Sequence, residues 1–189
     1  MEKLSLHTAN LHLTPPDVAD VGDILAACQD PQTQHWVPLP VPYLREHAVE
    51  YATAHTDKTW ADGTEYTWAI RSAGAFAGVV GLYRVADGAA DLGYWMVPAF
   101  RGRGLLTEAC TGVLDFAFAH PPEGLGLARV GWNAYAGNID SARVARKLGF
   151  HFEGTARLGA ALRGELRDDW AAGLLATDDR RIQDWPILD

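Results

Sequence analysis

Two glycines separated by one residue lie in the middle of the chain, in the segment VPAFRGRGLLTEA at positions 97–109. Gly102 and Gly104 leave this turn without side chains, so main-chain N–H groups can converge on a bulky anion such as a phosphate. Arg101 and Arg103 add positive charge to the same turn. Any fold of this chain must therefore accommodate a bare, cationic turn between its neighbouring elements.

The segments on either side of the turn have different periodicities. Residues 89–97, AADLGYWMV, are rich in aromatic and β-favouring residues and stop at Pro98, which predicts a strand. From Leu105 to Phe118, apolar residues recur at intervals of three and four, which predicts a helix with one apolar face. The unpaired N–H groups at the start of such a helix favour an anion. The sequence thus predicts a phosphate-binding turn between a strand and a helix.

Glycine-rich turns of this kind also occur in other phosphate-binding motifs. A P-loop requires Lys followed by Ser or Thr after its last glycine, and Leu105 and Leu106 stand there instead. A dinucleotide-binding fingerprint requires a small residue three positions after Gly104, where Thr107 stands. An ordinary solvated turn stays open on this segment alone.

Length and composition limit the class of protein. With 189 residues, of which 48% are hydrophobic, the chain can form one domain over residues 1–189 with a sizeable core. The net charge of −8 argues against a nucleic-acid-binding surface. Two cysteines, Cys28 and Cys110, are too few for a disulfide scaffold or a metal cluster, so we predict no metal. No apolar run approaches the roughly 20 residues that span a bilayer, and the first residues lack a signal-peptide core, so we expect a cytoplasmic protein without a membrane partner.

The remaining segments complete an α/β pattern. Residues 6–28 predict a strand and then a helix, with Thr14, Pro15 and Asp17 at the helix start and Val18, Val21, Leu25 and Cys28 facing inward. Residues 29–43 hold four prolines and predict an irregular segment. Later patterns predict a helix over 44–55, strands over 65–71, 76–85 and 127–133, a helix over 141–148, and a closing strand pair over 150–158 and 166–175. This order predicts a mixed sheet with helices on its faces.

Three segments carry a resemblance to a known family: DLGYWMVPAFRGRGLLTEA, LARVGWNAYAGNIDSARVARKLGFHFEG and RGELRDDWAAGLL. Together they resemble the GNAT superfamily of acetyl-CoA-dependent N-acetyltransferases, and most closely its ribosomal-protein N-terminal acetyltransferases. The resemblance spans nearly the whole chain. It implies a mostly antiparallel seven-stranded sheet with helices on both faces, and acetyl-CoA as the cosubstrate.

The resemblance also implies how the coenzyme is bound. The family's phosphate loop has Arg or Gln, two residues, Gly, one residue, and Gly or Ala, and Arg101 to Gly104 fit it while Leu106 departs at the last position. The N–H groups implied to hold the pyrophosphate are those of Gly102, Arg103, Gly104, Leu105, Leu106 and Thr107. The strand over 90–97 is implied to splay from its neighbour and to leave the Val97 N–H free to polarise the acetyl carbonyl.

Asn138 and Ser141 form a second motif within GNIDSARVARKLGF. In the resembling family the Asn contacts the pantetheine arm, and the residue at the Ser141 position lies near the thioester sulfur. Many members carry a Tyr seven residues after the Asn as the general acid, whereas this chain has Ala145. Ser141, or a water that it orders, is then the expected proton donor to the leaving thiolate. A plain capping role at the start of a short helix suits both residues as well.

The candidates for general base are Glu108, Glu153, Asp91, His35 and Glu65, and none stands out. Deprotonation at pH 7 costs about 1.1 kcal/mol for an α-amine but about 4.6 kcal/mol for a lysine ε-amine. A site without an evident strong base therefore favours an α-amine as the acceptor.

The acceptor region is expected in QHWVPLPVPY and TDKTWADGTEYTW, where aromatic rings and carboxylates gather outside the coenzyme motifs. Such residues suit a cationic amine, and we expect Trp36, Glu65 and Tyr94 to contact it, although sheet core would explain the aromatics equally well. The expected acceptor is a protein or peptide N-terminus, bound by a monomer or a homodimer. A small amine, amino acid or antibiotic as acceptor, a coenzyme A sensor without turnover, and a nucleotide-binding oxidoreductase stay open.

Overall fold

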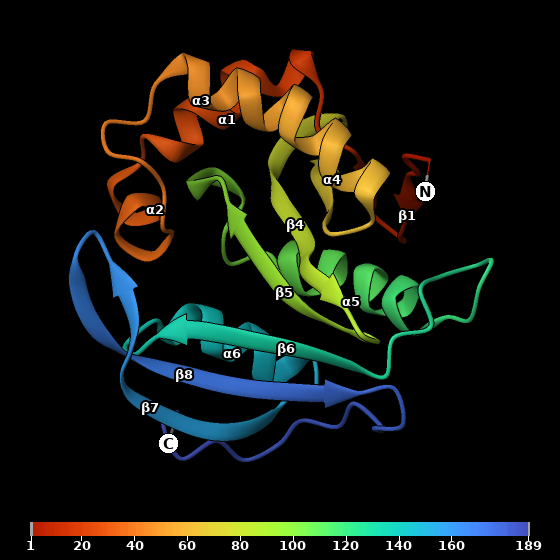
Figure 1. The fold of residues 1–189 in the computed structure, drawn as a ribbon, viewed down its shortest axis with the longest axis vertical. Coiled ribbons are helices and arrows are strands. Elements are labelled where there is room, and N and C mark those ends of the chain that lie inside the picture. The colour runs from red at the N-terminus through yellow and green to blue at the C-terminus, as the bar shows by residue number, and fades with distance from the viewer. Residues whose placement is uncertain (1, 189) are drawn as a thin grey trace.

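One eight-stranded sheet organises the computed structural model, which describes residues 2–188 (Figure 1). Its strands in chain order are β1 (Leu6–His7), β2 (Leu11–Thr14), β3 (Tyr66–Ser72), β4 (Ala75–Ala86), β5 (Ala89–Met96), β6 (Arg129–Tyr135), β7 (His151–Leu162) and β8 (Glu165–Leu175). They lie in the spatial order β1-β2-β3-β4-β5-β6-β8-β7. Strands β5 and β6 pair in parallel, and the other neighbouring pairs are antiparallel. The predicted mixed, mostly antiparallel sheet is confirmed.

Helices cover both faces of the sheet. They are α1 (Val21–Cys28), α2 (Pro31–Trp36), α3 (Arg45–Glu50), α4 (Thr56–Asp62), α5 (Leu105–Phe118) and α6 (Ile139–Lys147). One core cluster joins α5 and α6 to one face through residues such as Val113, Leu114 and Ala145. A second cluster, with Ile24 and Val79, joins α1 and α3 to the opposite face. The sheet therefore separates the two hydrophobic core clusters.

The parallel pair β5–β6 opens along its length. Its register runs from Ala89 opposite Arg129 to Asp91 opposite Gly131, and β5 and β6 do not pair with each other beyond that point, although each stays paired with its other neighbour. β5 goes on for five residues and β6 for four, and Figure 1 shows them diverging toward their carboxyl ends. The family-based expectation of a splayed strand pair thus matches the observed backbone.

Several boundaries differ from the sequence-based prediction. The first strand is a hairpin of β1 and β2, because the chain turns between Thr8 and Leu11, and this gives eight strands where seven were expected. The segment 18–20 forms a 3-10 turn capped by Asp17, so Val18 points outward and is 72% exposed, in contrast to its predicted inward position.

Two helical segments also differ from the sequence-based prediction. The Pro-rich segment contains α2, because Asp30 caps it by accepting a hydrogen bond from the Thr33 N–H and Pro31 suits its first turn. The helix expected over 44–55 continues through a π-helical stretch, Tyr51–His55, into α4, and ends where Gly63 adopts a φ of 71°.

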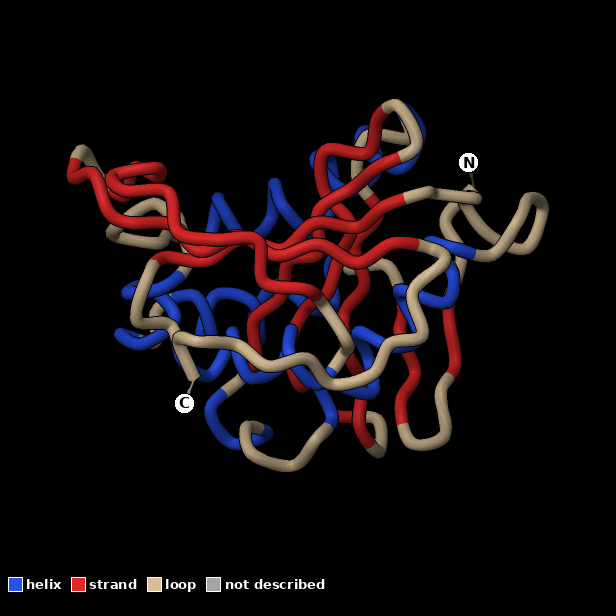
Figure 2. The backbone as a smooth tube through the Cα atoms, turned by 90° about the horizontal axis from the view of Figure 1, so that it is seen from below, coloured by secondary structure: helices blue, strands red, loops and turns tan. Residues whose placement is uncertain are grey.

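Residues 176–188 follow β8 as a segment without helix or strand. Figure 2 shows this segment in tan, crossing the molecule to the label C. The predictions from sequence assigned it no role.

Candidate active site

The opening between β5 and β6 belongs to a cavity of about 1020 Å³. Its walls come from α2 and the loop that follows, from β5, from the glycine-rich turn, from the start of α6, and from β6 and β8. Among the residues that line it are Trp36, Tyr43, Tyr51, Tyr83, Asp91, Leu92, Tyr94, Met96, Arg101, Gly102, Arg103, Gly104, Leu105, Leu106, Thr107, Trp132, Asn133, Asn138, Ser141, Arg143, Lys147 and Asp169. The cavity thus reaches the start of α5 and both sides of the strand opening.

The glycine-rich turn presents bare backbone to this cavity. Gly102 and Gly104 have φ values of 73° and 79°, which only glycine adopts without strain, and a Cβ at either position would meet no atom within 4 Å. Gly104 directly precedes α5, so the first N–H groups of a 14-residue helix lie at the turn. The space and the dipole direction both suit an anion.

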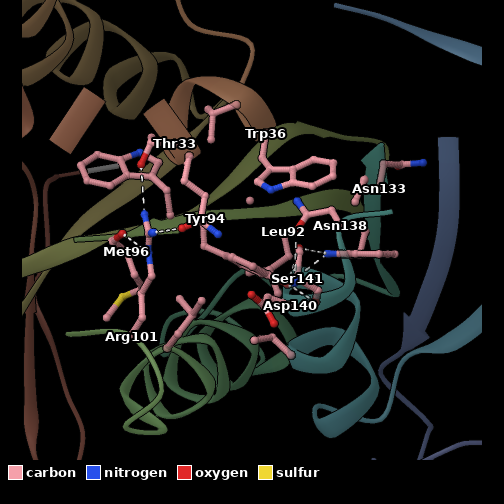
Figure 3. A pocket seen from close by; sticks show the side chains of 18 of the residues that line it. Thr33, Trp36, Leu92, Tyr94, Met96, Arg101, Asn133, Asn138, Asp140 and Ser141 are labelled. Atoms are coloured by element: carbon pink, nitrogen blue, oxygen red, sulfur yellow. Dashed lines mark hydrogen bonds between the residues drawn. The ribbon is translucent and has the colours of Figure 1, made fainter. Parts of the chain in front are cut away.

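The positive charge near the turn is distributed differently from what the sequence suggested. Arg101 turns toward α2, where its guanidinium donates to Thr33 Oγ1 and Asp30 Oδ2, and its Nε donates to the Met96 carbonyl at 3.0 Å (Figure 3). Its charge is matched by Asp30, so Arg101 anchors the turn to α2. The Cζ atom of Arg103 lies 5.5 Å from the centroid of the Phe100 ring.

Two further cations line the cavity and were missed by sequence reasoning. Arg143 and Lys147 stand one turn apart on α6. Their i, i+4 spacing after the Asn138 cap was the available signal, because residues four apart share one face of a helix.

The first turn of α6 carries a hydrogen-bonded cluster made of Ser141, Tyr94 and Trp132. The Trp132 indole Nε1 donates to Tyr94 Oη at 3.0 Å and to Ser141 Oγ at 3.2 Å. Ser141 Oγ lies 3.1 Å from Tyr94 Oη, which donates to the Ser141 carbonyl at 3.0 Å. Asn138 caps α6, since its side-chain oxygen accepts from the Ser141 N–H at 3.3 Å. The helix start is therefore joined to both strands of the opening.

Tyr94 belongs to this cluster and not to a separate acceptor pocket. Burial is the main cause that raises the pKa of its phenol, and the hydrogen bonds of Ser141 and Trp132 only partly offset it. The phenol therefore stays protonated at neutral pH and keeps its donor to the Ser141 carbonyl.

The expected free N–H at Val97 is contradicted by the register of β5. The Val97 N–H donates to the Ala77 carbonyl at 2.9 Å, on the β4 side. Because main-chain groups alternate along a strand, the N–H groups of Met96, Tyr94 and Leu92 point to the opposite side, toward the opening. The Met96 carbonyl, which accepts a hydrogen bond from Arg101 Nε, also points away from β4.

The opposite face of the opening carries a second polar group. Asn133 on β6 donates from Nδ2 to Asp169 Oδ2 on β8 at 3.0 Å, and both residues line the cavity. Burial raises the pKa of Asp169, against the hydrogen bond from Asn133 and the positive charge of Arg84. Asp91 lies on this face too and is paired with Arg84, whose Nε is 2.7 Å from Asp91 Oδ2. Asp169 was not among the residues singled out from the sequence, because its contact with Asn133 depends on strand register.

Glu108 lies outside the cavity and has a different role from the base suggested by the sequence. Its carboxylate accepts from Thr8 Oγ1 at 2.5 Å, and from the N–H and Nδ2 of Asn10 at 2.7 and 3.1 Å. Partial burial acts to raise its pKa, but these hydrogen bonds outweigh it and lower the pKa. Glu108 thus ties α5 to the β1–β2 turn.

The other proposed acceptor and base residues are divided between the cavity and its surroundings. Trp36 lines the cavity beside Asn138 (Figure 3). Glu65 is hydrogen-bonded to His55 Nε2 at 2.9 Å and does not line it. Glu153 forms a bidentate salt bridge with Arg129, and it does not line the cavity either. His35 packs edge-on against the Trp36 ring.

Within residues 2–188 no helix is long and apolar enough to cross a membrane. The same residues contain no group of three or more His, Cys, Asp or Glu side chains that could hold a metal ion.

In the comparison with protein families, residues 10–151 match the model described as "Acetyltransferase (GNAT) domain". The chain is also 36% identical over 107 residues to "Probable N-acetyltransferase YjcK" of Bacillus subtilis (strain 168). That alignment covers 55% of this chain and 57% of the relative, so the chain matches little more than half of that protein's length.

Among solved structures, one similar fold is RimL, described as a ribosomal L7/L12 alpha-N-protein acetyltransferase in complex with coenzyme A. Its TM-score is 0.80 at 18% identity, covering 91% of this chain and 98% of that chain. Mycobacterium smegmatis RimJ, in complex with a coenzyme A disulfide, has a TM-score of 0.78 at 21% identity, covering 95% and 90% of the two chains. At these identities the likeness concerns the fold.

Proposed function

The chain belongs to the GNAT acetyltransferase family, and on that premise we propose that it transfers the acetyl group of acetyl-CoA to the primary amine of an acceptor by direct attack in a ternary complex. The observation that carries the proposal is the opening between β5 and β6, which has a phosphate-type turn on one side and a carboxylate on the other. Acetyl-CoA on one face of the sheet and the acceptor on the other would then meet in the opening between β5 and β6. RimL and RimJ, which share the fold, were solved with coenzyme A or its disulfide.

The coenzyme side is assigned to the glycine-rich turn and α6. N–H groups from Gly102 to Thr107 would hold the pyrophosphate, with Arg103, Arg143 and Lys147 supplying charge. The pantetheine arm would run along the open edge of β5, past Asn138. N–H groups of Met96, Tyr94 or Leu92 replace Val97 as donors to the acetyl oxygen, on which negative charge develops during attack.

The chemical step needs one proton acceptor and one proton donor. Asp169 would take a proton from the acceptor ammonium, since its raised pKa makes it a better base than an ordinary carboxylate. The amine nitrogen then bonds to the carbonyl carbon and the carbon–sulfur bond breaks. The nitrogen loses its second proton as the amide forms. The Ser141 hydroxyl, held by Trp132 and Tyr94, would give its proton to the leaving thiolate and regain the proton released by the nitrogen, so the products are the amide, the coenzyme A thiol and protonated Asp169.

The acceptor is proposed to be an N-terminal α-amine of a protein or peptide. The acceptor side of the cavity is walled by Trp36, Tyr43, Tyr51 and Tyr83, and aromatic walls beside a carboxylate suit an ammonium group. The Tyr83 ring lies across Gly93, where a Cβ would come within 2.7 Å of Tyr83 Cε2. The half-buried Asp169 carboxylate as base suits an α-amine, whose pKa lies close to neutrality.

The proposal is tested by a thiol-release assay with acetyl-CoA and a panel of acceptors. The panel contains peptides beginning with Ala, Ser, Thr or Met, the same peptides with blocked N-termini, free amino acids and polyamines. We expect turnover with free N-termini and none with the blocked peptides. Turnover confined to amino acids or polyamines would replace the acceptor class, and acetyl-CoA binding without turnover on any amine would indicate a sensor.

A further inference from the structure

The segment 176–188, called the C-terminal strap below, is fastened to the helices on the coenzyme side. Arg180 Nη1 donates to Asp115 Oδ1 on α5 at 2.7 Å, and its guanidinium lies 5.5 Å from the centroid of the Phe118 ring. The strap passes so close to Gly149, just after α6, that a Cβ there would lie 2.4 Å from the Arg180 Cα. Figures 1 and 2 both show the strap running across this side of the molecule to the C-terminus.

Trp185 is the strap residue that reaches the core. Its side chain is 0% exposed, and its indole Nε1 donates to the Phe150 carbonyl at 2.9 Å. Its ring centroid lies 5.3 Å from that of Phe152 and 5.4 Å from that of Trp132. One side chain therefore joins the strap to β6, to β7 and to the connection that leaves α6.

The contact with Trp132 places Trp185 one step from the proposed proton donor. The Trp132 indole N–H is shared between Ser141 Oγ and Tyr94 Oη, so the plane of that indole decides where the shared donor points. Trp132 is 1% exposed, and Trp185 packs against it at an interplanar angle of 55°. A change in this packing would rotate or shift the donor that orients Ser141.

The second contact acts on the helix that carries Ser141. Phe150 donates its N–H to the Ala145 carbonyl of α6 while its own carbonyl accepts from Trp185. The strap thus holds the end of α6 as well as the indole that bonds its first turn. Both contacts converge on the position of Ser141 relative to β5 and β6.

We propose that Trp185 is a positioning residue for acetyl transfer, which sets the Trp132 indole and α6 so that the Ser141 hydroxyl meets the leaving sulfur. This inference rests on the proposed function, because it assigns Trp185 a part in the same reaction. Trp185 itself does not line the cavity and would touch neither the coenzyme nor the acceptor. Its effect should therefore appear in the chemical step and not in coenzyme affinity.

The test compares Trp185→Phe with Trp60→Phe, each alone and combined with Ser141→Ala. Trp60 is a matched control, since it is 1% exposed in the same core cluster and packs edge-on against Tyr66 and Trp68, away from the cavity. The readouts are the single-turnover rate, the Kd for acetyl-CoA, the melting temperature, and the nitrogen-15 resonance of the Trp132 indole N–H.

We expect Trp185→Phe to lower the single-turnover rate about tenfold, to leave the Kd for acetyl-CoA within about twofold, and to shift the Trp132 resonance. In the Ser141→Ala background it should cause no further loss of rate. Trp60→Phe should lower the melting temperature without these effects.

Three results would overturn the positioning role: an equal loss of rate in the Ser141→Ala background, an equal loss in Trp60→Phe, or an unmoved Trp132 resonance. A wild-type protein that transfers no acetyl group would instead overturn the proposed function. The Trp132 resonance, which does not depend on turnover, tells the two failures apart.

Discussion

The Ser141 hydroxyl is fixed by groups from both strands that border the opening. Trp132 on β6 donates to it, and Tyr94 on β5 shares a hydrogen bond with it at 3.1 Å. Because the raised pKa of Tyr94 keeps that phenol protonated, the cluster is neutral. A neutral, immobilised hydroxyl beside a leaving thiolate is a suitable proton donor.

Substitution of the two α6 residues should separate chemistry from binding. Ser141→Ala is expected to lower the rate of the chemical step by about 10²–10⁴-fold with little change in the Kd for acetyl-CoA. Asn138→Ala removes the helix cap, so it should cost about 1 kcal/mol of stability and weaken coenzyme binding. Single-turnover kinetics and calorimetric titration measure the two effects. A Ser141→Ala variant with the wild-type rate of the chemical step would leave Ser141 only a structural role in the capped first turn of α6.

Asp169→Asn should affect stability and rate in opposite directions. Burial raises the pKa of Asp169 in the folded state, so the ionised carboxylate costs folding free energy once the pH exceeds that pKa. Removing the charge is therefore expected to raise the melting temperature by about 1–3 °C at pH 7–8, with the gain vanishing at acidic pH. Acetyl transfer should slow at every pH. A variant with lower stability at pH 8 than at pH 4, relative to the wild type, would contradict this assignment.

At the scale of elements, local signals and long-range pairing differ in what they reveal. α5 and its glycine turn were predictable, because helical spacing and two glycines separated by one residue are local cues. The turn between β1 and β2 and the cap of α2 were also local, but they were obscured by an apparently continuous strand and by four prolines. The direction of the Val97 N–H and the meeting of Asn133 with Asp169 depend on strand register, which no short segment of sequence determines.

The glycine turn allows a matched comparison of two substitutions. Gly104 and Gly74 have φ values of 79° and 83°, and a Cβ meets no atom within 4 Å at either site. Valine at either position should cost about 1–2 kcal/mol of stability through left-handed backbone strain. Only Gly104→Val should also raise the Kd for acetyl-CoA, by about tenfold or more, because its side chain would occupy the phosphate turn. Equal coenzyme affinity in the two variants, measured by calorimetry, would remove the phosphate-turn assignment.

Over the whole molecule, the sheet separates the proposed coenzyme side from the proposed acceptor side. Tyr94, Trp132 and Ser141 gather on the face covered by α5 and α6, while Asp91, Asn133 and Asp169 lie on the other face of the sheet. The family and the coenzyme motifs were visible in the sequence, since they are contiguous segments. The proposed acceptor side was only partly predictable, because it is assembled from α2, β6 and β8. The strap over 176–188 was missed, since it has no periodic pattern.

The separation of the two sides is tested most directly by a conjugate in which the sulfur of coenzyme A is joined to the N-terminal amine of a peptide through an acetyl spacer. Calorimetric titration should give binding about 100-fold tighter than that of coenzyme A, since one molecule would occupy both sides of the β5–β6 opening. Gly104→Val should lower the affinity for both coenzyme A and the conjugate. Asp169→Asn should lower the affinity for the conjugate and leave that for coenzyme A unchanged. A conjugate that binds no more tightly than coenzyme A in the wild-type protein would contradict the account.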